Sequence, residues 1–222
     1  MASSTRKRPR LLGRPPGASG ERTREEILQA ALEAFAESSY DAMSVRELTR
    51  QLDVSHNLVH HYFGSKPALW RAAVDHALDR MIRELTTLLE EAVGGPDPVA
   101  TVRSGGERVM MLLARNPAVA RILLDESARG GERLDYIYDR FLKPGMEVLK
   151  LFLASARGRG LRDIDPRILS LFCMNVTATF FTQAALAKKL GIPPPTSARE
   201  LDPHARALVE LMLSGIVEGD VG

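Results

Sequence analysis

The chain has 222 residues, of which 45% are hydrophobic and 26% charged, as is ordinary for a globular protein. No apolar run approaches the roughly 18 residues that span a bilayer, and the N-terminus lacks the apolar segment of a secretory signal. We therefore expect a cytoplasmic protein with no membrane partner. The single cysteine, Cys173, excludes an internal disulfide.

Positive charge is concentrated at the N-terminus. Five of the 30 basic residues lie within residues 1–20, which contain no acid, so the other 202 residues carry 28 acidic and 25 basic side chains. The segment is also rich in Pro, Gly and Ser, and it cannot bury enough apolar surface to offset the entropy of ordering it. We expect residues 1–20 to be a disordered basic arm that either attracts an anionic polymer or only solubilises the chain.

Capping signals along the chain predict helix starts. Thr23 and Ser44 each precede a glutamate by three residues, the capping-box pattern that opens a helix. Four further pairs place a cap-forming side chain before a proline, whose missing N–H costs nothing at the first helical position. These pairs begin at Asp97, Asn116, Asp165 and Asp202.

The spacing of apolar residues predicts an all-α fold of about nine helices. Apolar residues recur at helical intervals between the predicted starts, as at Ile27, Ala31, Ala34 and Phe35. No segment alternates strictly over the length of a strand. Pro144-Gly145 falls inside a helical pattern, where it should kink or divide the helix.

The first three predicted helices are short and closely linked. They cover residues 23–38, 44–52 and 55–62. Only Asp53 and Val54 separate the last two, and so short a turn forces these helices to cross steeply, as in a helix-turn-helix. Ser55 is a suitable N-cap for the third helix.

The third helix has an apolar side and a polar side. Val59 and Phe63 can pack on the first two helices. The opposite side carries His56, Asn57, His60 and His61. These side chains can bond base edges and phosphates, and Leu58 at the margin could touch a thymine methyl. Ser65 and Lys66 begin the next helix, where a phosphate would meet an ammonium and free backbone N–H groups.

A metal site is an alternative for His56 and His60, whose spacing of four places both rings on one helix face. Such a site needs further ligands, and the nearby candidates are Asp53 and Asp75, with no Cys-x-x-Cys or His-Glu-x-x-His pattern. An ordinary surface helix with chance histidines is the other alternative. Because nucleophile-elbow and phosphate-loop patterns are also missing, we expect no metal, no cofactor and no enzyme activity.

The run SVRELTRQLDVSHNLVHHYFGSKPALW resembles the DNA-binding domain of TetR-family transcriptional regulators. The resemblance extends from Thr23 to Trp70, and residues 62–66 match the family's aromatic-Phe-x-Ser-Lys signature. The sequence departs from the family pattern at two places. His60 stands where the family usually has a phosphate-binding tyrosine. Residues 57–59 stand where the family usually has a glycine, a small residue and a leucine. The resemblance implies a helix-turn-helix domain over residues 21–66, followed by a helical domain over 67–222 that binds a small molecule and forms a homodimer.

The resemblance and the helix faces together define three groups of candidate residues. Contacts with double-stranded DNA at a palindromic operator are expected from Ser44, Val45, Arg46, Ser55, His56, Asn57, Leu58, His60, His61, Tyr62 and Lys66. The homodimer is expected through helices over 165–191 and 202–218, with Leu169, Phe172, Val176, Phe180, Leu208, Leu211, Met212 and Ile216. Candidates for lining the effector pocket are Met110, Met111, Phe141, Phe152, Met174, Thr177, Phe181, Phe180 and Gln183.

The predicted function is that of a repressor released from its operator by a small effector. Met and Phe residues fill irregular apolar space, so the effector should be apolar or amphipathic. A regulator of the same fold that answers to a protein partner, or that has no effector, is the alternative.

Overall fold

The computed structural model describes residues 16–93, 96–114, 117–191 and 198–217. Its elements are α1 (Pro16–Ala42), α2 (Val45–Gln51), α3 (His56–Phe63), α4 (Lys66–Ala92), α5 (Pro98–Ala114), α6 (Pro117–Arg129), α7 (Glu132–Ile137), the π-helical turn η1 (Tyr138–Leu142), α8 (Lys143–Ala156), α9 (Pro166–Thr182), α10 (Ala184–Lys189) and α11 (Ala198–Ile216). The all-α prediction is confirmed. With α7, η1 and α8 taken as one continuous helix, and α10 as a continuation of α9, the described residues form the nine helices expected.

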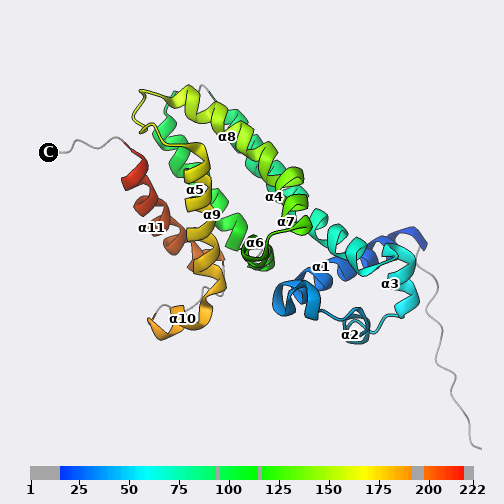
Figure 1. The fold of residues 1–222 in the computed structure, drawn as a ribbon. Helices are drawn as coiled ribbons and strands as arrows, with labels where there is room; N and C mark the ends of the chain where they lie inside the picture. Colours follow the sequence, from blue (N-terminus) through cyan, green and yellow to red (C-terminus); the bar gives the residue numbers. More distant parts are fainter. Residues whose placement is uncertain (1–15, 94–95, 115–116, 192–197, 218–222) are drawn as a thin grey trace, which may run out of the picture.

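The helices form two units joined by long elements (Figure 1). The first three helices and the start of α4 lie at one end of the molecule, and the later helices lie at the other. α4 runs from the first unit into the second, where α8 packs along it, and α6 packs on both α1 and α9. Helices α4 and α6 therefore connect the two units. No helix in the described ranges is long and apolar enough to cross a membrane.

Helix α1 begins earlier than predicted. It starts at Pro16 rather than at Thr23, so residues 16–20 of the expected arm are helical, and residues 1–15 lie outside the described residues. Two glycines make this stretch a poor helix former by itself. A contact from α3 supports it, because the Tyr62 hydroxyl donates to the Gly20 carbonyl at 3.3 Å. Thr23 therefore lies inside the helix and is not its N-cap.

Most of the other predicted caps are confirmed. The side chains of Ser44, Ser55 and Asp97 accept from the backbone N–H three residues onward, and Asp165 accepts from the Arg167 N–H. Asn116 lies outside the described residues, although α6 begins at Pro117 as expected. The start at Asp202 is wrong: α11 begins at Ala198 and encloses Pro203, which lacks an N–H to bond the carbonyl four residues earlier. The predicted helix over 165–191 is interrupted at Gln183, between α9 and α10.

The helix that runs from α7 through η1 into α8 has a wider turn just before Pro144, where the sequence predicts a kink or a division. The chain passes from α7 through η1 into α8, where the proline occupies the first turn. In η1 the Lys143 N–H donates to the Tyr138 carbonyl, five residues back. A proline cannot continue the ordinary hydrogen-bond ladder, and a π turn at this point lets the helix proceed on a shifted register.

The described residues form a large apolar core that spans the junction and a smaller one within the second unit. The larger one is built on Trp70, Phe35, Phe63 and Phe141 and extends from the first three helices to α6, α7 and η1. The smaller one surrounds Phe152 at the far end of the second unit. Because the first core includes residues of both units, the helix-turn-helix is packed on the rest of the protein and is not a freely tethered module.

Candidate nucleic-acid interface

A tight turn sets the angle between α2 and α3. The Val54 N–H donates to the Thr49 carbonyl at 3.1 Å and the Asp53 N–H to the Arg50 carbonyl at 3.4 Å, the paired bonds of a Schellman motif. Asp53 has a φ of 52°, the left-handed conformation that this motif requires. Ser55 follows at once, and its Oγ accepts from the Leu58 N–H at 3.1 Å. The turn and the cap together fix where α3 begins.

Replacing Asp53 by glycine is expected to raise the free energy of unfolding by about 0.5–1 kcal/mol, because glycine adopts the left-handed conformation without a Cβ penalty. Urea unfolding of D53G against the native chain measures the gain. D53A is the control, since it removes the same charge but keeps the Cβ. Equal stabilisation by both variants would show that the lost charge, rather than the backbone conformation, is responsible.

The inner side of α3 is anchored as predicted. Val59 and Phe63 are buried and pack in one core with Leu48 of α2 and Phe35 of α1. The Arg24 guanidinium also lies 5.6 Å from the centre of the Phe63 ring. This packing prevents α3 from rotating about its axis, so the same residues always face outward.

The outer side of α3 presents four polar side chains to solvent. His56, Asn57, His60 and His61 are all exposed, and Leu58 is half-buried at the margin. Asparagine can pair with an adenine edge by accepting through its amide oxygen and donating through its amide NH2, and imidazole can donate to phosphates or base edges. The predicted polar face is thus a single accessible surface of the kind that enters a major groove.

Helix α2 carries two exposed arginines, Arg46 and Arg50. Ser44 and Arg46 are exposed, and Val45 is half-buried against the core. Arg50 donates to both carboxylate oxygens of Glu47, from Nε at 3.0 Å and from Nη2 at 2.5 Å. These hydrogen bonds from Arg50 lower the pKa of Glu47, which stays ionised and compensates the arginine. Arg46 makes no ion pair within the described residues and is the available cation on α2.

Two of the residues predicted to contact DNA make hydrogen bonds within the protein. Tyr62 is half-buried and donates to Gly20, as described above. The Lys66 ammonium lies 4.9 Å from the Tyr40 ring centre and donates to the Asp41 carbonyl at 3.2 Å. In this conformation Lys66 binds the end of α1. The Ser65 Oγ caps α4 by accepting from the Ala68 N–H at 3.3 Å.

The alternative metal site gains no further ligands. Among the described residues, no group of three His, Cys, Asp or Glu side chains is placed to hold a metal ion. Asp75 instead accepts from the Tyr136 hydroxyl at 2.7 Å. Burial, together with this hydrogen bond, raises the pKa of Tyr136 to about 12. Asp75 therefore belongs to the contact between α4 and α7, not to the histidine face.

A buried ion pair at the junction of the two units was not predicted. Glu126 of α6 is 2% exposed, and its Oε1 accepts from the Arg133 Nε at 2.7 Å. The Arg133 guanidinium also lies 4.2 Å from the centre of the Tyr40 ring, in the last turn of α1. Glu126 falls four residues after Ile122 and seven after Val119, so an acid on the apolar stripe of α6 was the available sequence signal.

The predicted dimer residues do not all face outward. Leu169 and Ile216 are buried in the smaller core of the protomer, and Leu208 and Met212 are half-buried in it or beside it. Phe172 and Leu211 are exposed, whereas the side chains of Val176 and Phe180 lie outside the description. Ile168 and Leu171, which were not predicted, are also exposed beside Phe172 on α9.

Two of the predicted pocket residues that the structure describes lie in different cores. Phe141 belongs to the larger core and Phe152 to the smaller one, so these two rings are core residues and do not line one cavity. Met174 is half-buried, with its sulfur 3.9 Å from the Ser170 hydroxyl, and Gln183 is exposed. The side chains of Met110, Met111, Thr177, Phe180 and Phe181 lie outside the description.

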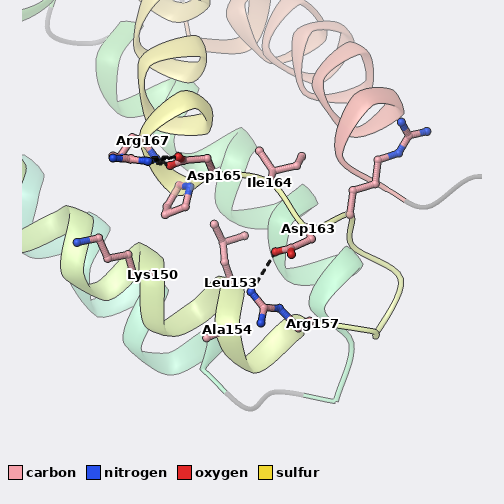
Figure 2. A pocket seen from close by; sticks show the side chains of 10 residues that line it. Lys150, Leu153, Ala154, Arg157, Asp163, Ile164, Asp165 and Arg167 are labelled. Carbon is pink, nitrogen blue, oxygen red and sulfur yellow. Dashed lines mark hydrogen bonds and ion pairs between the residues drawn. The ribbon is translucent and has the colours of Figure 1, made fainter.

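A charged groove of about 520 Å³ lies between the end of α8 and the start of α9 (Figure 2). Within it Arg157 pairs with Asp163 at 3.1 Å, and Arg167 pairs with Asp165. Hydrogen bonds from Arg167 lower the pKa of Asp165 to about 2. These guanidinium groups are already compensated by carboxylates, so the groove differs from the apolar effector site that the sequence predicts.

Comparisons with known proteins agree with the geometry of α2 and α3. Residues 27–73 match the profile of bacterial regulatory proteins of the tetR family. The chain is 32% identical over 142 residues to the HTH-type transcriptional repressor Rv3405c of Mycobacterium tuberculosis, covering 60% of this chain and 76% of that protein.

Solved structures share the fold over most of the chain. The ketosteroid transcriptional regulator KstR2 of Mycobacterium tuberculosis matches with a TM-score of 0.65 at 22% identity, covering 89% of this chain and 96% of that one. The regulator PfmR from Thermus thermophilus matches with a TM-score of 0.63 at 20% identity, covering 88% and 98%. The chain belongs to the tetR family of bacterial regulatory proteins and is a DNA-binding transcriptional regulator, not an enzyme.

Proposed function

We propose that the protein is a homodimeric repressor that a small apolar or amphipathic effector releases from a near-palindromic operator. Two copies of α3 would enter successive major grooves, about 34–36 Å apart. Because an effector can shift this equilibrium only through different affinities for two conformations, its pocket must differ between the bound and released states. Binding to chromosomal DNA would place the protein in the cytoplasm.

The outer face of α3 carries this proposal. His56, Asn57, His60 and His61 are exposed together on a helix whose other side is locked into the core. Arg46 adds a cation near the N-terminus of α2. Both helices belong to the DNA-binding domain that we propose for residues 21–66. The basic arm would add contacts with the phosphate backbone that depend little on sequence.

Replacing Asn57 by alanine is expected to lose roughly 1–3 kcal/mol of discrimination at one base pair, because its amide can pair with an adenine edge. The measurement compares N57A with the native protein on the selected operator and on operators substituted at each position. An equal loss on all DNA sequences would instead mean that Asn57 only positions the protein on the backbone.

The effector and the operator can be identified in one experiment. Bound sequences are selected from random DNA, and metabolites are then screened for release of the selected DNA. Release by apolar or amphipathic compounds supports the proposal. The alternative is a regulator of the same fold that responds to a protein partner. It is favoured if no compound releases the DNA but a protein from the same cell does.

The apolar surface left exposed by the second unit supports the homodimer. Ile168, Leu171 and Phe172 form a stripe on α9 at intervals of three and four residues, and Leu211 is 71% exposed on α11. Two copies of such a pair of helices can bury these side chains in a four-helix seam. The seam would fix the distance between the two α3 helices, which half-site recognition requires.

A further inference from the structure

The helix proposed to enter the major groove has no permanently charged cation. Its sequence is HNLVHHYF, and its exposed positions include His56, His60 and His61. A helix in the groove lies between the phosphates of both strands, where positive charge supplies much of the affinity for DNA. Three imidazoles occupy the positions from which a lysine or an arginine would act.

The neighbouring helices supply little of the missing charge. On α2, Arg50 is bonded to Glu47, which leaves Arg46 as the available cation. Asp53, in the turn before α3, is exposed and acidic. Lys66 at the start of α4 is held by Tyr40 and the Asp41 carbonyl.

Two described side chains of α1 near α3 add no cation to its outer face. Its Arg24 lies over the Phe63 ring on the inner side of α3. Glu21, which follows the Gly20 that Tyr62 contacts, is an exposed acid. Among the described side chains, positive charge on the outer face of α3 beyond that of Arg46 must therefore come from its own histidines.

We propose that His56, His60 and His61 make DNA binding pH-dependent, so that affinity rises as the pH falls from 8 to 6. This inference rests on the proposed operator contact of α3. Imidazole is the side chain that ordinarily gains or loses its proton in this range. The protonated ring donates from both nitrogens and carries a positive charge, and both properties favour contact with phosphates.

Proton uptake and DNA binding are coupled reciprocally. If the protonated imidazole binds DNA more tightly than the neutral ring, DNA must in turn favour protonation. Each imidazole that takes up a full proton on binding steepens the affinity by up to about tenfold per pH unit. A protonated ring at a phosphate also steepens the dependence of log K on log salt by about 0.9.

The test measures binding of the full chain to its selected operator and to a random-sequence duplex, at pH 6 and pH 8 and at several salt concentrations. The native protein should bind both DNAs about 10- to 100-fold more tightly at pH 6 than at pH 8. The slope of log K against log salt should be steeper by about one to two at pH 6. The triple variant H56N/H60N/H61N should lose most of this difference. H76N, which removes an exposed histidine of α4, is the matched control and should keep it.

Several results would overturn the inference. The affinity of the native protein for DNA could be the same at pH 6 and pH 8, or the triple variant could retain the pH effect. A pH effect on operator binding but not on random DNA would exclude the phosphate contact. If the triple variant does not fold by circular dichroism, the single variants H56N, H60N and H61N give the answer, because at least one must reduce the effect. Failure to bind any DNA at either pH would instead contradict the operator contact itself.

Discussion

Replacing Arg133 by methionine is expected to lower the free energy of unfolding by about 3 kcal/mol. The Glu126 carboxylate is 2% exposed and bonds Arg133 at 2.7 Å, while its Oε2 has no partner within the described residues. Removing the guanidinium leaves a buried charge uncompensated, which costs more than the ion pair contributes. The expected loss is at the lower end of the range for such pairs because Arg133 is 28% exposed and solvent screens it in part.

Urea unfolding of R133M measures the loss, and the double variant E126L/R133M identifies its cause. With both charges replaced by apolar side chains, stability should return to within about 1 kcal/mol of the native protein. A double variant as unstable as R133M would show that lost packing on Tyr40 is responsible, and not the unpaired carboxylate. Because Tyr40 lies just before α2, the R133M variant should also show faster amide exchange in α2 and α3.

Placing an aspartate at both Phe172 and Leu211 is expected to convert the protein to a monomer of 24.4 kDa. Both side chains are exposed in the protomer, at 48% and 71%, so the substitutions should leave its own core intact. In a homodimer joined through α9 and α11, the same changes would bury four carboxylates in an apolar seam. Operator affinity should then fall by about 100-fold or more, because two half-sites are bound tightly only when their reading heads are linked.

Sedimentation of F172D/L211D gives the oligomeric state, and titration with the selected operator gives the affinity. L151D is the control, because Leu151 is also an exposed leucine, at 63%, but lies on α8. L151D should remain dimeric with native affinity. A dimeric F172D/L211D would place the interface elsewhere on the protomer.

The sequence was sufficient to predict which side of α3 is exposed. Ser44 and Ser55 bond backbone groups only three residues away, so their capping roles depend on local sequence alone. The two-residue turn at Asp53 restricts the path of the chain, and Val59 and Phe63 fix which side of α3 is buried. With these three constraints in the sequence, the exposure of His56 and Asn57 follows.

In α9 and α11 the sequence could not distinguish the inner face from the outer one. Ile168, Leu169, Leu171 and Phe172 are all apolar, so periodicity alone does not separate the one that is buried from the three that are exposed. That separation follows from the packing of α9 on α8 and α5. Leu169, which the sequence places at the dimer interface, is buried in the core of the protomer for this reason.

Contacts between distant segments were decided by the tertiary structure. Lys66 is a surface cation in the sequence, but the end of α1 provides Tyr40 and the Asp41 carbonyl to bind it. Residues 16–20 are poor helix formers, yet the contact of Tyr62 with Gly20 supports a helix there. Caps and turns are set by neighbours a few residues apart, and the sequence alone determined them here. The orientation of long side chains depends on groups that only the folded chain brings near, so the roles of Lys66, Tyr62 and Arg133 were decided by the tertiary structure.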